Sequence, residues 1–363
     1  MAYTNIDDST AYFQTALWTG DNSSSRTITN DGNSDMQPDL VWIKQRSTST
    51  NHFYYDSSRG FGNDKELPTN TDTVEGGLDN NLYGYVSAAT SNGFTVASGT
   101  TNNDDMNQST RNYVGWQWKC NGGTTSTNTD GDINSTVQVS STAGFSIVQY
   151  SPSDSTQRTI GHGLGSAPDI VWIRARNRTE NTWLYHSAIG LSGILLDTES
   201  AYNTSAASTG IKAVGASTFT VGTNPVVNGA YNYIAYCWKK TKGFSDFGKY
   251  IGNGDANGPY IYTGFKPAWI LIKNIATDVS WFMLDRKRNP INVASRTLRP
   301  NTTGAESGTT AEWLDFLSDG FKIRPNSGYY GDSSYNANAN TYIYMAFAEN
   351  PFVTSTGVPT TAG

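Results

Sequence analysis

The chain has 363 residues, a formal net charge of −6 and a charged fraction of 15%, well below the roughly 25% of an average globular protein. Its 36 glycines and its 12% aromatic content argue against a disordered chain and favour an all-β protein with many turns. The longest basic run is only residues 286–288, so duplex nucleic acid is not an expected partner.

Targeting and redox signals are weak. Residues 1–5 carry neither the basic nor the apolar region of a signal peptide, and no run approaches the roughly 18 apolar residues of a membrane span. We therefore expect a chain made in the cytoplasm, without membrane insertion. Its two cysteines, Cys120 and Cys237, are too few for a disulfide framework, and we expect both to be free.

The first predicted central strand is the heptapeptide Pro-Asp-Leu-Val-Trp-Ile-Lys at residues 38–44, and it returns in related form at 168–174 and 267–273. In the first copy Val41 and Ile43 form one strand face, while Leu40 and Trp42 form the other. Both faces are apolar, which predicts a strand buried on both sides. The leading proline suits the start of a strand, where a missing N–H leaves the hydrogen-bond ladder intact.

Other elements recur in the same order after each heptapeptide. They are an aromatic step at 52–57, 183–187 and 281–285, a strand at 92–96, 217–221 and 319–323, and a closing strand at 113–119, 233–239 and 342–348. The closing strands alternate large apolar with small or polar residues, the pattern of a strand with one face in a core. The residues that define the repeat are Pro38, Trp42, Trp118, Pro168, Trp172, Trp238, Pro267, Trp269 and Phe347.

This repetition predicts an all-β fold of three tandem β-sandwich repeats, jelly-roll or lectin-like, with at most short helices. The predicted boundaries are 1–120, 142–240 and 241–363, with a Gly/Ser/Thr/Asn-rich connector at 121–141. One short helix is predicted over residues 310–317, with Thr310 as its N-cap.

The repeated cassette resembles a module of tailed-bacteriophage virion proteins, common in marine and cyanobacterial phages, and its most specific part is residues 243–267. The resemblance implies a virion structural protein, a capsid decoration or tail appendage, that is made in the host cytoplasm and displayed on the particle surface. It implies other virion proteins as partners and an oligomeric state within the particle. It brings no catalytic residues.

The third copy departs from the other two, because Ala268 replaces Asp39 and Asp169, and Ala348 replaces Lys119 and Lys239. These departures suggest that the charges are dispensable. We therefore expect a charge change at Asp39 to be mild, whereas an aspartate at Ile43 or Ile173 should unfold one repeat.

No residue is predicted to be catalytic, to bind a cofactor or to bind a metal, and we expect a protein that is not an enzyme. His52, His162 and His186 lie far apart, without partners at metal-ligand spacing. The calcium-like start at Asp130 lacks the glycine and the glutamate of an EF-hand. A looser calcium site of loop oxygens, there or at Asn253, Asp255 and Asn257, stays open as an alternative to ordinary turns.

The binding candidates are Tyr329, Tyr330 and Tyr335, in a Gly/Ser/Asn-rich loop at residues 326–340. Tyrosine presents an apolar face and a polar tip, which suits contact with sugars. The alternative function is therefore a tail-fibre or tail-tip adhesin that binds host surface glycans. A depolymerase is the least favoured reading, since no carboxylate pair is recognisable at glycosidase spacing.

Overall fold

The computed structural model describes residues 3–78, 80–101, 105–201, 209–308, 314–325, 328–329 and 331–360. The first segment, unit 1, contains η1 (Ser9–Ala11), β1 (Phe13–Thr19), β2 (Arg26–Thr29), β3 (Leu40–Gln45), β4 (His52–Asp56), β5 (Leu67–Pro68), α1 (Asn80–Tyr83), β6 (Tyr85–Thr90), β7 (Gly93–Ala97) and β8 (Asn112–Trp118).

Unit 2 contains β9 (Ser126–Asn128), β10 (Ser135–Ser140), β11 (Phe145–Tyr150), β12 (Arg158–Gly161), β13 (Ile170–Ala175), β14 (Trp183–His186), η2 (Ser187–Ile189), β15 (Gly190–Leu195), β16 (Ile211–Val214), β17 (Thr218–Val221) and β18 (Tyr233–Trp238). Unit 3 contains β19 (Ser245–Ile251), β20 (Tyr260–Tyr262), β21 (Phe265–Asn274), β22 (Phe282–Asp285), β23 (Arg296–Thr297), β24 (Ser307–Gly308), β25 (Leu314–Leu317), β26 (Gly320–Ile323) and β27 (Thr341–Pro351).

One pattern of strand pairing occurs in each unit. A large antiparallel sheet contains β1-β8-β3-β4 in unit 1, β11-β18-β13-β14 in unit 2 and β19-β27-β21-β22 in unit 3. A small sheet follows the orders β2-β7-β6, β12-β17-β16 and β20-β26-β25. The prediction of an all-β fold with at most short helices is confirmed.

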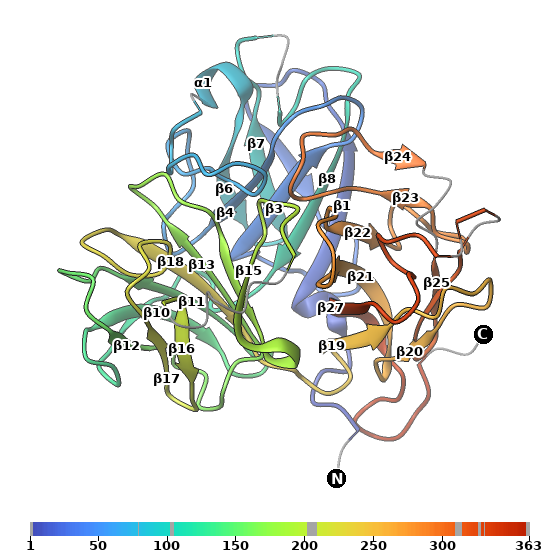
Figure 1. The fold of residues 1–363 in the computed structure, drawn as a ribbon. Helices are drawn as coiled ribbons and strands as arrows, with labels where there is room; N and C mark the ends of the chain where they lie inside the picture. The colour runs from blue at the N-terminus through green and yellow to red at the C-terminus, as the bar shows by residue number, and fades with distance from the viewer. Residues whose placement is uncertain are drawn as a thin grey trace.

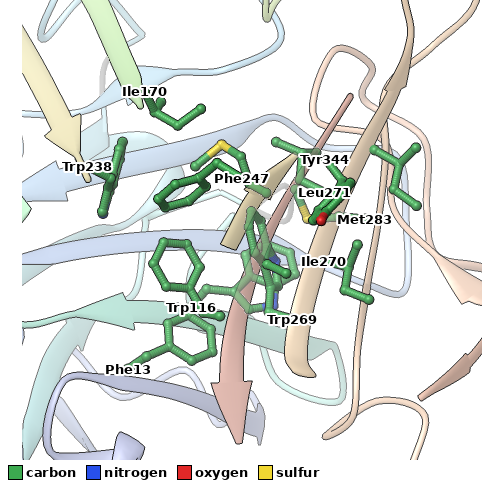
Figure 2. Packing of buried hydrophobic residues seen from close by; sticks show 14 of the residues in the cluster. Phe13, Trp116, Ile170, Trp238, Phe247, Trp269, Ile270, Leu271, Met283 and Tyr344 are labelled. Carbon is green, nitrogen blue, oxygen red and sulfur yellow. The ribbon is translucent and has the colours of Figure 1, made fainter. Parts of the chain in front are cut away.

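The large sheets are buried on both faces, as the heptapeptides predict. In unit 1 Val41 and Ile43 pack with the small sheet, through Phe94 and Val96. The opposite face of all three large sheets contributes to one common core, which contains Trp42, Trp172 and Trp269 among its buried residues. Figure 1 shows the three units arranged around this centre, and Figure 2 shows side chains of all three units converging there.

The aromatic residues that end the closing strands meet at the centre of the common core. The ring centroids of Trp118 and Trp238 are 6.3 Å apart, those of Trp118 and Phe347 are 5.6 Å apart, and those of Trp238 and Phe347 are 6.5 Å apart. Each ring comes from a different unit. These distances fall in the range of favourable aromatic pairs, so the three units are joined by a shared core rather than by chain linkage alone.

Polar contacts join neighbouring units around the common core. Tyr236 of unit 2 donates a hydrogen bond to Asp56 of unit 1 at 2.6 Å, and Trp116 of unit 1 donates to Asp285 of unit 3 at 3.0 Å. His186 of unit 2 donates through Nε2 to the carbonyl oxygen of Tyr344 in unit 3 at 3.1 Å. The aromatic step of every unit therefore contacts the closing strand of another unit.

The cation that ends each heptapeptide also reaches a neighbouring unit. Lys44 donates to the Thr303 carbonyl at 3.1 Å, and Lys273 donates to the Glu199 carbonyl at 2.8 Å. Arg174 donates to the carbonyls of Thr71 and Thr73 at 2.9 and 2.7 Å. These buried cations fix the loops of the adjacent unit, because a buried charge has to be hydrogen-bonded.

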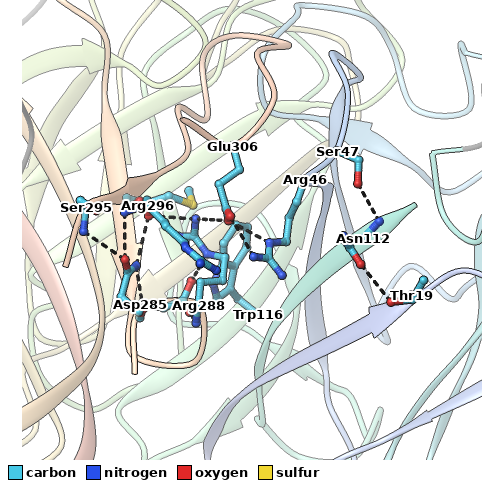
Figure 3. Close-up of polar contacts among 12 residues, drawn as sticks. Thr19, Arg46, Ser47, Asn112, Trp116, Asp285, Arg288, Ser295, Arg296 and Glu306 are labelled. Carbon is cyan, nitrogen blue, oxygen red and sulfur yellow. Dashed lines mark hydrogen bonds and ion pairs between the residues drawn. The ribbon is translucent and has the colours of Figure 1, made fainter. Parts of the chain in front are cut away.

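Two of the three joints contain a glutamate bridged by two arginines. Glu306 accepts two hydrogen bonds from Arg46, both 2.8 Å, and one from Arg288 at 3.1 Å (Figure 3). Glu75 is bridged in the same way by Arg176 and Arg59. Unit 3 has Ile275 where units 1 and 2 have Arg46 and Arg176, so the joint between units 2 and 3 is built differently.

Asp39 holds the chain where it leaves unit 1. Its buried carboxylate accepts hydrogen bonds from Ser57 Oγ at 2.5 Å and from the amides of Cys120, Gly122 and Gly123 at 2.6, 3.0 and 2.8 Å. These contacts argue against the expectation that its charge is dispensable. In unit 3 the closing strand β27 continues to Pro351, whereas β8 ends at Trp118, just before the amides that Asp39 holds.

Two other sequence expectations change. Residues 121–141, expected as a connector, contribute β9 and β10 to the large sheet of unit 2. The helix predicted over 310–317 is wrong in its described part, where residues 314–317 form β25; residues 310–313 lie outside the described residues. Leu314 and Phe316 are buried while Asp315 faces outward, so alternation with period two outweighs the helical signal.

Cys120 and Cys237 are free, as predicted, and both are buried. Within the part of the chain that the structure describes, no helix has the length and apolar character needed to cross a membrane.

Candidate binding surface

Of the described tyrosines that were predicted as a surface patch, one is exposed and one is buried. Tyr329 is 42% exposed, but Tyr335 is only 1% exposed and belongs to the common core, and Tyr330 lies outside the described residues. The ring of Tyr335 packs edge-on against Phe282 with centroids 6.2 Å apart. Its carbonyl oxygen accepts a hydrogen bond of 2.8 Å from the Tyr250 hydroxyl, so this part of the loop turns inward.

The residues that define the repeat are structural. All nine are buried: Pro38, Trp42, Trp118, Pro168, Trp172, Trp238, Pro267, Trp269 and Phe347. None is accessible to a ligand, and their packing accounts for their place in each unit.

Exposed tyrosines gather instead on β20, the edge strand of the small sheet in unit 3. Tyr260 is 46% and Tyr262 is 58% exposed, while Ile261 between them is 7% exposed and belongs to the core. Successive side chains of a strand point to opposite faces, so the two tyrosines share the outer face of the sheet. We call Tyr3, Tyr260 and Tyr262 the tyrosine face.

Hydrogen bonds hold the tyrosine face in place. The Tyr3 hydroxyl donates to the Gly264 carbonyl at 2.9 Å and lies 3.2 Å from the Tyr262 hydroxyl, which can therefore donate to it. Lys242 Nζ lies 4.8 Å from the centre of the Tyr3 ring, a cation–π distance. These contacts bring the N-terminal segment alongside β20, although 259 residues separate Tyr3 from Tyr262.

The phenol groups of Tyr3 and Tyr260 stay protonated at neutral pH. Burial raises the pKa of Tyr3, and the hydrogen bond with Tyr262 raises it further. Burial and a hydrogen bond with Asp319 likewise raise the pKa of Tyr260. These two residues therefore present neutral hydroxyl groups beside apolar rings.

Charged residues continue this outer face on the neighbouring strands. Lys322 lies opposite Tyr260 in β26, and its ammonium donates to the Gly258 carbonyl at 2.9 Å. Asp315 lies opposite Lys322 in β25 and pairs with Arg324 at 3.5 Å. A ligand on the rings would therefore find hydrogen-bonding groups of both signs nearby.

Only unit 3 carries tyrosines at these positions. The registers of the small sheets align Tyr260 with Thr27 and Thr159, and they align Tyr262 with Thr29 and Gly161. The scaffold that the three units share does not explain this difference, although the contact between Tyr262 and Tyr3 accounts for part of it. Aligning residues 260–262 with residues 27–29 and 159–161 could have revealed this difference from the sequence.

The loop oxygens considered for calcium are engaged in turns. Asn253 Oδ1 accepts the Asp255 amide at 3.1 Å, and Asp255 Oδ1 accepts the Asn257 amide at 2.8 Å. Asp130 receives a hydrogen bond of 3.0 Å from the Asn128 side chain. Among the described residues, no three His, Cys, Asp or Glu side chains are grouped as metal ligands.

The three histidines are buried in three different places. Burial lowers the pKa of each of them, that of His186 to about 4. His162 donates through Nε2 to the Gly215 carbonyl at 3.1 Å, and its Nδ1 accepts the Leu164 amide. Both nitrogens of His162 and of His186 are therefore engaged in structural hydrogen bonds.

Comparison with known proteins identifies the family of the chain but not its function. No curated protein matches the chain. A family described as a domain of unknown function, DUF7483, matches residues 8–351 and so spans all three units. The chain belongs to this DUF7483 family.

Proposed function

We propose that this protein is a non-enzymatic structural component displayed on the surface of a tailed-bacteriophage virion, as a capsid decoration or a tail appendage. The observation that supports the proposal is the shared aromatic core, which joins three units into one body with polar joints between them. A body of this kind suits a role that demands rigidity and exposed attachment faces.

A further contact joins unit 1 and unit 3. Asp7 accepts hydrogen bonds of 2.6 Å from both the amide and the hydroxyl of Ser355, so the segments before β1 and after β27 are tied together. The proposed partners are other virion proteins, and the copies are proposed to be oligomeric within the particle.

Purified particles of the encoding phage test this proposal. Mass spectrometry should find the protein in gradient-purified virions, and cryo-electron microscopy should show density for its three-unit body on the head or tail. Absence of the protein from intact particles, with normal particle yield after gene deletion, would reject the proposal.

The second candidate function is that of a tail-fibre or tail-tip adhesin that binds host surface glycans. The tyrosine face favours it, because Tyr260 and Tyr262 present two exposed rings on one strand face, with the Tyr3 hydroxyl 3.2 Å from that of Tyr262. Exposed aromatic side chains of this kind commonly dominate the energy of a binding surface.

A glycan array with purified protein tests the adhesin. The double variant Tyr260→Thr/Tyr262→Thr gives the face residues like those of unit 1, and Tyr329→Thr is an exposed control. The double variant should lower glycan affinity by about tenfold or more, since losing a dominant tyrosine costs about 2 kcal/mol. Equal binding by the double variant and the control would exclude the tyrosine face as the binding site.

A further inference from the structure

A groove of about 440 Å³ lies at the seam, which is the joint between unit 3 and unit 1. Phe13, Gln14 and Thr15 of β1 line one side, and Ala268, Arg286 and Glu349 of unit 3 line the other. Its volume is in the range of small-molecule binding sites. The tyrosine face contributes no residue to its lining.

The groove exists because unit 3 lacks the residues that occupy this place in the other units. Asp39 bonds to Ser57 and to the chain that leaves unit 1, and Asp169 bonds to Ser187 and to the amide of Lys240. In unit 3 the aspartate is Ala268. Arg286 stands where units 1 and 2 have Ser57 and Ser187. Ala348 stands where they have Lys119 and Lys239. The small side chains of Ala268 and Ala348 leave the space open.

Three polar atoms of lining residues are shielded from solvent and form no hydrogen bond within the protein: Thr15 Oγ1, Arg286 Nε and Glu349 Oε2. Arg286 Nε and Glu349 Oε2 are 3.6 Å apart, too far for a hydrogen bond. The other carboxylate oxygen of Glu349 pairs with Lys266 at 3.3 Å. The groove therefore has, just beneath its surface, a donor, an acceptor and a hydroxyl that form no hydrogen bond within the protein, although Arg286 and Glu349 form an ion pair.

The charges of the lining balance. Arg286 and Lys287 are cationic, Asp31 and Glu349 are anionic, and Lys287 is paired with Asp31 at 2.5 Å at the exposed rim. A balanced lining gives no preference for an ion of either sign. It favours a neutral ligand whose groups can both donate and accept hydrogen bonds, as hydroxyl groups do.

The floor of the groove is apolar. Phe13 stacks on Phe347 with centroids 5.4 Å apart, and Ala268, Ala348 and Pro290 surround it. A ligand that fits has an apolar C–H surface on one side and hydroxyl groups at its edge. A hexose ring has this chemistry.

We propose that the seam groove binds a neutral hexose unit of a glycan, with Thr15, Arg286 and Glu349 contacting its hydroxyl groups and the apolar floor facing its C–H surface. This inference rests on the proposed glycan-binding role, and it adds a second site to the tyrosine face.

Isothermal titration and saturation-transfer NMR of the full chain test the groove. The probes are glucose, galactose, mannose and their disaccharides, with glucuronic acid and glucosamine as charged comparators. Thr15→Val removes the hydroxyl at nearly constant shape, and Glu349→Gln removes the charge. Each should weaken binding of the preferred neutral sugar by about fivefold, the value of one lost hydrogen bond.

Thr19→Val, further along the same strand and exposed, is the matched control and should leave affinity unchanged, as should Tyr260→Thr/Tyr262→Thr. Unchanged melting temperatures would show that the groove variants are folded. Absence of saturable binding at millimolar sugar, preference for a charged sugar, or binding unaffected by Thr15→Val and Glu349→Gln would each overturn the groove assignment. Array binding through the tyrosine face is measured separately and shows whether the adhesin role survives.

Discussion

The Tyr236 hydroxyl donates a hydrogen bond of 2.6 Å to Asp56 Oδ2 inside the common core, where both residues are buried. Asp56 also accepts the Arg59 amide at 2.9 Å and pairs with the Arg59 side chain. One carboxylate therefore ends a strand of unit 1, compensates a buried arginine and joins unit 2. The same step position in unit 3, Asp285, pairs with Arg288 and joins unit 1 through Trp116.

Tyr236→Phe should destabilise the protein by about 1.5–3 kcal/mol, because it removes a buried hydrogen bond to a charged acceptor. Guanidinium-induced unfolding followed by tryptophan fluorescence measures this change. Tyr329→Phe is the control, since Tyr329 is exposed and its variant should stay within about 0.5 kcal/mol of the wild type. Equal stability of the two variants would show that the joint does not depend on this hydrogen bond.

Asp39→Ala should cost about 2–4 kcal/mol, because it leaves the Ser57 hydroxyl and three backbone amides without their acceptor. The reverse change, Ala268→Asp, should bring no stabilisation, since unit 3 has Arg286 in place of the serine and its closing strand β27 continues to Pro351 at that point. Thermal unfolding of both variants measures the contrast. A neutral Asp39→Ala variant would show that the departing chain is held by other contacts.

Ile43→Asp should prevent folding of unit 1 and, through the common core, lower the stability of the whole chain. Ile43 has no exposed surface and packs between the two sheets of unit 1, where an unpaired carboxylate is strongly unfavourable. Limited proteolysis and circular dichroism report the loss, and Ile43→Val is the conservative control. A folded Ile43→Asp variant would contradict the assigned core.

Glu306→Gln should reduce the loss of folding stability that occurs at acid pH. Burial alone would raise the pKa of Glu306, but hydrogen bonds and charges of Arg46 and Arg288 outweigh it and lower this pKa. A lowered folded-state pKa gives stability that is present above the unfolded value near roughly 4.3 and is lost as the pH falls through the folded value.

The wild type should therefore lose more stability below about pH 4.3 than Glu306→Gln does, while the variant should be the less stable of the two at pH 7. Urea titrations at successive pH values measure the two curves. Parallel curves would exclude a stabilising charge on Glu306.

His186→Gln tests a second pH window. Burial lowers the pKa of His186 from 6.5 to about 4, so the unfolded chain binds the proton first. The wild type should lose up to about 3 kcal/mol from this group as the pH falls from about 6.5 to 4. The glutamine amide can still donate to the Tyr344 carbonyl, so His186→Gln should fold and lack this contribution. An unchanged slope in that window would refute the assignment to His186.

The sequence by itself determined the strands and their burial, because both depend on local alternation. Val41 and Ile43 on one face and Leu40 and Trp42 on the other predicted a strand buried on both sides, and all four are buried. The same alternation in β20 contains the information that Ile261 faces inward and that Tyr260 and Tyr262 face outward, once a small sheet is known to pack there.

Only the tertiary structure decided what each buried face contacts and where the binding surfaces lie. Tyr335 was predicted to be exposed because of its polar loop, but Phe282 and Tyr250 enclose it in the core. Asp39 looked dispensable until its contacts with the departing chain were visible. The joints pair residues as distant as Asp56 and Tyr236, 180 positions apart. Contacts of that range depend on how whole sheets pack against one another, and no local sequence pattern specifies them.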